Sequence, residues 1–268
     1  MTSPTEQPQP PFPRQELDRP GLEKELSPRP NYQAPAYRGS GKLTDKVALI
    51  TGGDSGIGRA VAVLYAREGA DVALVYTDAE QSDAEETREA VEAEGRRAVL
   101  LPGDVTDPDL CRQAVARTRE ALGGLDIVVN NAAFQNHVDQ PEDISLEQWD
   151  RTFKTNIYGY FHIVQAALPH LGEGASIINT GSITGLEGHG GLIDYATTKG
   201  AIHAFTKSLA QALIERGIRV NCVAPGPVWT PLNPAERSAD EVAEFGAGTP
   251  LGRPAQPEEI APAYVFFA

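Results

Sequence analysis

Apolar residues gather in six short runs, and most of these runs are apolar at successive rather than alternating positions. A strand that is buried on both faces of a parallel sheet has this pattern, whereas a strand with one face in water alternates. The pattern therefore predicts six buried strands. They cover residues 47–50, 72–76, 98–101, 127–129, 176–178 and 218–223.

Longer segments with helical spacing separate the runs. These segments cover residues 57–68, 80–94, 108–122, 145–170 and 194–215, and a last helix is expected from Pro257. Glycines that can stop a helix follow four of them closely: Gly69, Gly95, Gly123 and Gly217. The alternation predicts an α/β fold with a doubly wound parallel sheet of the Rossmann type, formed by a single domain over residues 41–268.

Residues 1–40 differ from the rest of the chain, because they hold nine of its 21 prolines, from Pro4 to Pro35. Such a segment favours extended conformations and cannot build a core of its own. Two interpretations stay open. The segment is either a disordered tail or an arm that lies on the folded surface. The second uses apolar anchors at Phe12, Leu22, Tyr32 and Tyr37.

Charge and composition narrow the function. The 268 residues carry a net charge of −14, which argues against a nucleic acid or an anionic membrane as partner. No apolar run approaches the roughly 20 residues that span a bilayer. The two cysteines, Cys111 and Cys222, exclude a disulfide scaffold, and the five histidines lack metal-ligand spacing. We therefore expect a cytoplasmic protein without a metal site.

A glycine-rich turn follows the first predicted strand, with the spacing Thr-Gly-x-x-x-Gly-x-Gly from Thr51 to Gly58. Gly52 would permit a tight turn, Gly56 a close approach to a pyrophosphate, and Gly58 close packing of helix on sheet. The N–H groups and the dipole of the following helix favour phosphate. After a first strand in an α/β pattern, this turn predicts dinucleotide binding rather than an ordinary βα connection.

A residue at the end of the second strand normally contacts the adenosine ribose. An acidic residue there favours NAD, and an arginine favours NADP. Here the strand ends in Tyr76-Thr77-Asp78, and no Arg or Lys occurs at 53–55 or 76–80. Asp54 and Asp78 would repel an additional phosphate. The sequence therefore favours NAD over NADP.

Polar residues also end the third and fourth strands. Asp104 is either an acceptor for the adenine amino group or a turn residue, and Asp107 is the better N-cap for the next helix. In Asn130-Asn131-Ala132-Ala133 the asparagines can bridge strands while the alanines leave room for a ligand. A simple turn explains any one of these residues but not the group.

Tyr195 and Lys199 lie four residues apart at the start of a helix, so they share one face. A nearby ammonium is expected to lower the pKa of the phenol, which can then exchange a proton with an alcohol or carbonyl oxygen. Ser182, at the end of the fifth strand, would hold that oxygen, unless it is only a turn serine. Asn156 is either a buried amide that binds water or backbone, or a tolerated polar residue.

These motifs, in this order and spacing, resemble the short-chain dehydrogenase/reductase family over residues 41–268. The proline-rich arm, the Gly39–Leu43 stretch and the Gly52–Gly56 stretch are similar to a bacterial subgroup of stress-associated and glucose-dehydrogenase-like members. The resemblance implies an NAD(P)-dependent oxidoreductase that interconverts an alcohol and a carbonyl compound. It also implies a homo-oligomer, a tetramer in this family.

The resemblance assigns roles to residues. Tyr195 would be the general acid/base, Lys199 would lower its pKa and bind the nicotinamide ribose, Ser182 would orient the carbonyl, and Asn156 would hold a water of the proton relay. The expected cofactor-binding residues are Gly52, Asp54, Ser55, Gly56, Ile57, Gly58, Tyr76, Asp104, Val105, Asn131, Ala132, Ala133, Thr180, Tyr195, Lys199, Pro225, Gly226, Val228 and Thr230.

Three positions depart from the family pattern. Ala133 stands where glycine is usual, Tyr76 occupies the position that selects the cofactor, and the sequence ends at Ala268 soon after the last helix. The family continues with an edge strand. We therefore expect either a fragment or a sheet without that strand, with an exposed edge and a weaker subunit interface.

The segment 227–250 resembles the family's substrate lid. Candidates for lining a pocket are Phe134, Gln135, His137, His189, Asp194 and Trp229. Each of them is otherwise an ordinary loop or packing residue. Two other functions remain as alternatives. One is a non-catalytic dinucleotide sensor or scaffold, and the other is an epimerase or dehydratase that uses the same Tyr and Lys.

Overall fold

The computed structural model describes residues 7–268, and their centre is a six-stranded parallel sheet in the order β3-β2-β1-β4-β5-β6. The strands are β1 (Val47–Thr51), β2 (Asp71–Tyr76), β3 (Ala98–Pro102), β4 (Ile127–Asn130), β5 (Ser176–Thr180) and β6 (Arg219–Val223). The central strands β1, β4 and β5 are buried at every position, as successive apolar residues require. The predicted doubly wound α/β fold is confirmed.

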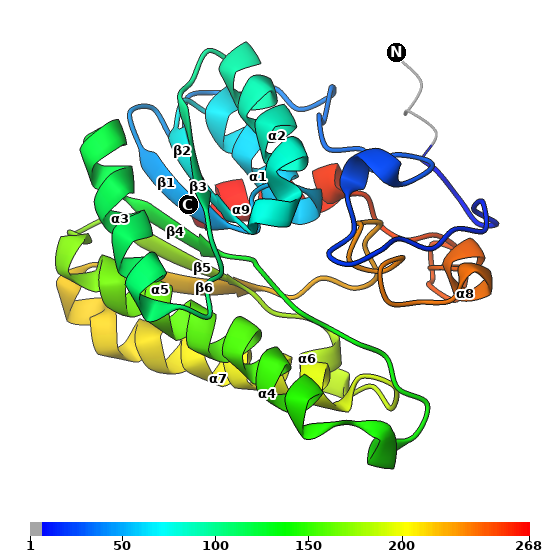
Figure 1. Cartoon of the computed structure of the whole chain (residues 1–268). Coiled ribbons are helices and arrows are strands. Elements are labelled where there is room, and N and C mark those ends of the chain that lie inside the picture. The colour runs from blue at the N-terminus through cyan, green and yellow to red at the C-terminus, as the bar shows by residue number, and fades with distance from the viewer. Residues whose placement is uncertain (1–6) are drawn as a thin grey trace.

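Helices cover both faces of the sheet (Figure 1). One face carries α1 (Gly56–Arg67), α2 (Gln81–Ala93) and α9 (Pro257–Phe267). The other face carries α3 (Pro108–Leu122), α4 (Leu146–Phe153), α5 (Gly159–Ala167) and α7 (Ile193–Leu213). Each face has its own apolar core, formed where helices pack on the strands.

The expected single helix over 145–170 is wrong in detail. The chain forms α4, then a π-helical turn over Lys154–Tyr158, then α5, and it ends in a 3-10 turn over Leu168–His170. A π turn holds one more residue than an α turn, so it changes which side chains face the sheet. Two short helices were also not expected: α6 (Thr184–Glu187) and α8 (Ala239–Ala243).

The last helix closes the α1 face. The hydroxyl of Tyr65 on α1 donates to the backbone oxygen of Tyr264 at 3.1 Å, and the hydroxyl of Tyr264 lies 2.7 Å from that of Thr180 on β5. Within residues 7–268 no seventh strand pairs with β6, which forms an edge of the sheet. Among these residues no helix is long and apolar enough to cross a membrane.

The described part of the proline-rich segment lies on the folded surface, beside α8 and the start of α9 (Figure 1). Pro4 lies outside the described residues. Phe12 is buried in a small cluster with Trp229 and Phe245, while Tyr32 and Tyr37 pack against the core on the α1 face. Residues 7–40 therefore follow the second of the two interpretations, and we call them the arm.

The arm joins the domain at Glu68, whose side chain is buried at the end of α1. Its carboxylate accepts the N–H groups of Ser40 and Lys42 at 2.9 Å each, the Lys42 ammonium at 2.8 Å and the Tyr37 hydroxyl. Burial raises the pKa of Glu68, but these hydrogen bonds outweigh it and lower the pKa from 4.5 to about 2. The ionised carboxylate is therefore the form that the fold binds.

We predict that Glu68 makes the fold sensitive to acid. Because its pKa is lower in the folded chain, its contribution is complete above pH 4.5 and is lost as pH falls towards 2. Glu68→Gln should lower the free energy of unfolding near pH 7 by on the order of 3 kcal/mol, and much less near pH 2. Urea unfolding at several pH values measures this. Glu120→Gln, at an exposed position of α3, is the control, and equal losses at both pH values would contradict the prediction.

Candidate functional site

A cavity of about 760 Å³ opens where the strands end, on the side where β1, β2, β4, β5 and β6 lead into their loops. Of the residues expected at the cofactor or the reaction centre, all but two line it. The lining ones are Gly52, Asp54, Ser55, Gly56, Ile57, Tyr76, Asp104, Val105, Asn131, Ala132, Ala133, Thr180, Ser182, Tyr195, Lys199, Pro225, Gly226, Val228 and Thr230. The two exceptions, Gly58 and Asn156, lie behind the wall.

The turn after β1 needs its glycines for the expected steric reasons, with one difference. Gly52 has a φ of +61°, which a tight turn requires. A Cβ on Gly58 would lie 1.9 Å from the Gly52 carbonyl oxygen, so Gly58 allows α1 to pack closely. A Cβ on Gly56 would lie 2.9 Å from Thr230. Gly56 therefore makes room for the 227–250 segment, and its close approach to a pyrophosphate stays a prediction.

Hydrogen bonds fix the ends of β1, β4 and β5 relative to one another. The Asn130 amide donates to Asn179 at 2.9 Å, which confirms that asparagine bridges neighbouring strands. Asn131 donates to the Gly52 carbonyl oxygen at 3.0 Å, and its own N–H donates to the Thr51 hydroxyl at 2.9 Å. These hydrogen bonds therefore hold the turn and the end of β4 together at the cavity.

Carboxyl groups surround the cavity at the end of β2. Asp78 is exposed at the rim, and Glu80, which the sequence analysis did not single out, also lines the wall. Burial raises the pKa of Asp54 well above its usual value, and the charge of Glu80 adds to this. Burial raises the pKa of Glu80 as well. Asp54 and Glu80 therefore oppose a further negative charge less than expected, and the exposed Asp78 carries more of that effect.

Asp104 lines the cavity beyond β3, and its carboxylate accepts the N–H of Thr106 at 2.9 Å. Arg151 of α4 lies 3.5 Å from the same carboxylate. Asp107 accepts the N–H of Asp109 at 2.8 Å, so it is the N-cap of α3, as predicted. The adenine contact of Asp104 stays a prediction.

Tyr195 and Lys199 face the cavity together from α7, as their spacing predicts. The Lys199 ammonium lies 5.3 Å from the centre of the Tyr195 ring and donates to the Thr180 carbonyl oxygen at 2.7 Å. Both side chains are buried. Burial lowers the pKa of Lys199 to about 7.

The expected lowering of the Tyr195 pKa is wrong for the described residues. Burial raises the pKa of the phenol, and a hydrogen bond with Ser182 only partly opposes this. The physical reason is desolvation, which penalises the phenolate more than the surrounding groups stabilise it. At neutral pH the phenol therefore holds its proton.

Ser182 follows β5 and lies at the same wall. Its hydroxyl oxygen accepts the Thr184 hydroxyl at 2.9 Å and the Thr184 N–H at 3.2 Å. This arrangement begins the short helix α6 and orients Ser182 beside Tyr195. Ser182 thus occupies a turn and lines the cavity beside Tyr195, while its role in holding a substrate oxygen stays a prediction.

Asn156 is fully buried in the π-helical turn. Its amide accepts the Phe134 N–H at 2.8 Å and donates to the Phe134 carbonyl oxygen at 2.9 Å and the Thr198 hydroxyl at 3.0 Å. The amide therefore binds backbone, one of the expected possibilities, and ties the loop after β4 to α7. Its role in holding a water stays a prediction.

The expected pocket residues divide into two groups. Phe134, Gln135 and His189 line the cavity. His137 does not line the cavity. Its N–H instead donates to the buried carboxylate of Glu236 at 2.7 Å. Asp194 accepts the Thr152 hydroxyl of α4 at 2.6 Å, and Trp229 is buried against the arm. These two residues hold elements together rather than face a ligand.

The arm supplies lining residues that the sequence analysis missed, namely Arg19, Pro20 and Gly21. The Arg19 guanidinium lies 4.9 Å from the centre of the Phe134 ring and donates to the Asn136 side chain. No motif marks these residues, because only tertiary packing brings the arm to the cavity. Within residues 7–268, no group of three or more His, Cys, Asp or Glu side chains is placed to hold a metal ion.

A protein-family model described as enoyl-(acyl carrier protein) reductase matches residues 52–268. General stress protein 39 of Bacillus subtilis is 54% identical over 250 residues, which cover 93% of this chain and 87% of that protein. The glucose and ribitol dehydrogenase of Daucus carota is 46% identical over 261 residues, or 96% of this chain and 90% of the relative. Both agree with the subgroup that the sequence resembles.

A solved structure has the same fold. The short-chain dehydrogenase of Burkholderia cenocepacia, in complex with NADP, superposes with a TM-score of 0.77 at 37% identity, covering 84% of this chain and 91% of that one. It supports NAD(P) binding and gives no support to the expected preference for NAD. With the fold, the cavity and these matches, the chain belongs to the short-chain dehydrogenase/reductase family of oxidoreductases.

Proposed function

We propose that the chain binds NAD or NADP in the cavity and interconverts an alcohol and a carbonyl compound by hydride transfer. One observation carries this proposal. Tyr195, Ser182 and Lys199 come from two elements and share one wall of the cavity, next to the residues that follow β1 and β4. A sensor or scaffold would not need a buried phenol, hydroxyl and ammonium at one place.

The cavity suits a dinucleotide. Its volume of about 760 Å³ lies in the usual range for ligand sites. Ile57 lines it in the first turn of α1, where N–H groups have no partner inside the helix and the helix dipole favours phosphate. The Gly52 turn leaves the backbone open to a close approach. When bound, the nicotinamide supplies or accepts the hydride.

The side chains of the chain would manage the proton. The buried phenol of Tyr195 holds its proton at neutral pH, so it can donate that proton to a carbonyl oxygen as the oxygen becomes an alcohol. The Ser182 hydroxyl would orient the same oxygen. Lys199 would stabilise the phenolate that remains, in its charged form, and hold the nicotinamide ribose.

The substrate class is open to a direct assay. The relative from carrot is named for glucose and ribitol, so a sugar and a polyol are the first substrates to try. The name of the family model points instead to the double bond of an enoyl group. An epimerase or dehydratase would change its substrate without net change in NAD(P)H. Product analysis therefore separates these activities from alcohol oxidation.

Two further details belong to the proposal. Asp78, exposed at the end of β2, favours NAD over NADP by charge.

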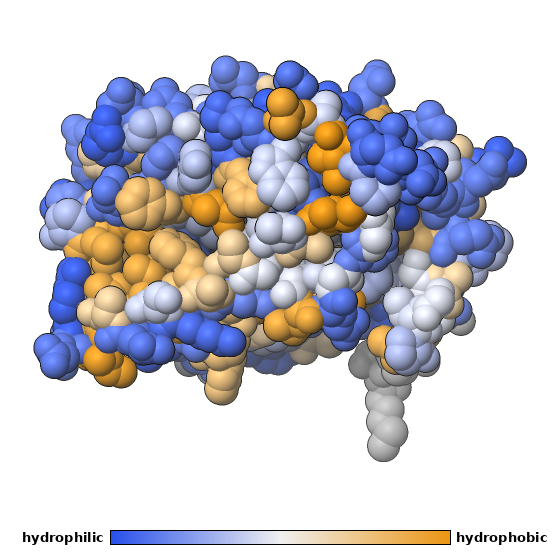
Figure 2. Space-filling view, turned by 90° about the horizontal axis from the view of Figure 1, so that it is seen from below, coloured by the Kyte–Doolittle hydropathy of each residue, from blue (hydrophilic) through white to orange (hydrophobic). Residues whose placement is uncertain are grey.

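A homo-oligomer, a tetramer by the resemblance, is supported by exposed aromatic side chains along α4, the π-helical turn and α5, among them Tyr158 at 52% and Phe161 at 47% exposed. Figure 2 looks at the face that carries these helices and α7, and apolar side chains gather on its left half.

We predict that Tyr195→Phe lowers kcat/KM by a factor of about 10² to 10⁴, the usual contribution of a general acid or base. The affinity for NADH should change less than about twofold, because the phenol oxygen is the only group removed. Steady-state rates with the best sugar, polyol, aldehyde or ketone and an NADH titration measure both. Tyr158→Phe, at an exposed position, is the matched control. Wild-type turnover in Tyr195→Phe would contradict the assignment.

For the cofactor, we predict that NADH binds about tenfold more tightly than NADPH, since a like charge near the rim costs about 1 kcal/mol or more. Asp78→Asn should reduce this difference, and Asp109→Asn, an exposed carboxylate on α3, should leave it unchanged. Fluorescence titration of each variant with both cofactors gives the ratio. Tighter binding of NADPH by the unaltered chain would overturn the prediction.

For assembly, we predict that Phe161→Glu converts the oligomer to a smaller species. A buried, unpaired carboxylate would oppose contact between copies of α5. Light scattering after size exclusion measures the mass, and circular dichroism checks the fold. Leu251→Glu, at a position that is also exposed but lies outside these helices, is the control. A wild-type mass for Phe161→Glu would place the interface elsewhere.

A further inference from the structure

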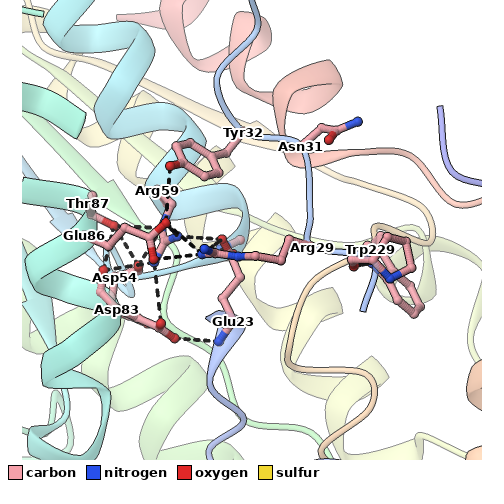
Figure 3. Close-up of polar contacts among 12 residues, drawn as sticks. Glu23, Arg29, Asn31, Tyr32, Asp54, Arg59, Asp83, Glu86, Thr87 and Trp229 are labelled. Atoms are coloured by element: carbon pink, nitrogen blue, oxygen red, sulfur yellow. Dashed lines mark hydrogen bonds and ion pairs between the residues drawn. The ribbon is translucent and has the colours of Figure 1, made fainter. Parts of the chain in front are cut away.

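The arm contains a buried carboxylate that the proposed reaction does not use. The side chain of Glu23 is fully buried, although the residue belongs to an irregular surface segment. One carboxylate oxygen accepts the N–H of Gly56 at 2.6 Å, and the other lies 2.8 Å from a terminal nitrogen of Arg59 (Figure 3). Burying this charge is costly unless it is paired and hydrogen-bonded, so its contacts need an explanation.

Arg59 is the partner, and it too is fully buried. Its Nε donates to the Asp54 carbonyl oxygen at 3.0 Å and to the Thr87 hydroxyl at 2.9 Å. The N–H of Glu23 in turn donates to the Asp83 carboxylate at 2.6 Å. Figure 3 shows these side chains converging from the arm, α1 and α2 on one point.

These contacts hold the 54–56 turn at two points. Glu23 binds the turn directly at the Gly56 N–H, and indirectly through Arg59 at the Asp54 carbonyl oxygen. Asp54, Ser55 and Gly56 line the cavity, whereas Glu23 does not. Glu23 therefore contacts the cavity wall from the side that faces away from the cavity, where it would not contact a bound cofactor.

The same arm also contacts the 227–250 segment, which lies against the glycine-rich turn at Gly56. The Trp229 indole N–H donates to the Pro28 carbonyl oxygen at 2.8 Å, and Phe12 stacks on the Trp229 ring at 4.1 Å between centres. The Phe12 N–H donates to the Ala243 carbonyl oxygen at 2.8 Å. Between these anchors, the Arg19–Gly21 stretch lines the cavity. The arm thus bridges the glycine-rich turn and the 227–250 segment.

We propose that Glu23 is a positioning residue for the dinucleotide site, which sets the conformation of the 54–56 turn through Gly56 and Arg59. The arm is then part of the cofactor site and not only a cover for apolar surface. This inference rests on the proposed binding of NAD(P) in the cavity. If the arm were only a cover, changes at Glu23 would lower stability and leave cofactor affinity intact.

Glu23→Gln tests the proposal, because glutamine keeps the shape and can accept the Gly56 N–H but removes the charge beside Arg59. The dissociation constant of NADH, measured by calorimetry on the full chain, should rise about tenfold, within the usual range of coupling between sites. Glu25→Gln is the matched control, since Glu25 lies on the same 3-10 turn and is exposed. It should leave the constant unchanged.

The outcomes separate the two proposals. If the unaltered chain binds neither NADH nor NADPH, the proposed function fails. If it binds, and folded Glu23→Gln binds equally well with only a lower melting temperature, the positioning role is overturned. Restored affinity in Glu23→Asp would show that the charge beside Arg59, and not the length of the side chain, is required.

A second measurement needs no variant. Coupling between sites is reciprocal, so a cofactor that depends on the arm must in turn stabilise it. Hydrogen exchange of the unaltered chain should slow at Phe12 and Leu26 when NADH is added, because both residues are buried in the arm and neither lines the cavity. Unchanged exchange at both positions, with NADH bound, would overturn the proposal.

Discussion

The close approach of α1 to the turn after β1 is the constraint on which the rest of the site depends. No side chain fits between Gly58 and the Gly52 carbonyl oxygen, so the first turn of α1 lies directly against the end of β1. That strand stands where the order β3-β2-β1-β4-β5-β6 reverses direction along the chain. Loops on its two sides diverge there and leave a crevice. The position of the cavity is therefore a consequence of topology and of one missing Cβ.

Burial then decides the chemistry of the groups in that crevice. Burial removes water from both Tyr195 and Lys199. It raises the pKa of the phenol and lowers the pKa of the ammonium, so it favours the neutral form of each group. The ammonium, with a pKa of about 7, can exchange a proton at neutral pH, whereas the raised pKa of the phenol keeps its proton in place. The Thr180 carbonyl oxygen holds the ammonium in place through one hydrogen bond of 2.7 Å. A ligand that restores charge nearby would shift both groups again.

Periodicity predicted the strands and most helices, because these depend on local patterns. Motif spacing and the family resemblance together predicted about half of the residues that line the cavity. The π-helical turn around Asn156 was not predicted, since a shift of one residue in the apolar spacing does not by itself identify a π turn. The direction of the Tyr195 pKa was missed for another reason. Sequence shows which charges are near in the chain but not how much water the fold removes. Glu23 was missed because its partner Arg59 is distant in sequence.

The composition of the arm supports order once its anchors are known. Proline restricts φ in the unfolded chain as well, so a proline-rich segment loses less entropy when it settles on a surface. That loss is offset at a few buried points, Phe12, Leu26 and the Glu23–Arg59 pair, rather than by a continuous core. The same prolines that suggest a disordered tail in the sequence therefore lower the cost of an ordered arm.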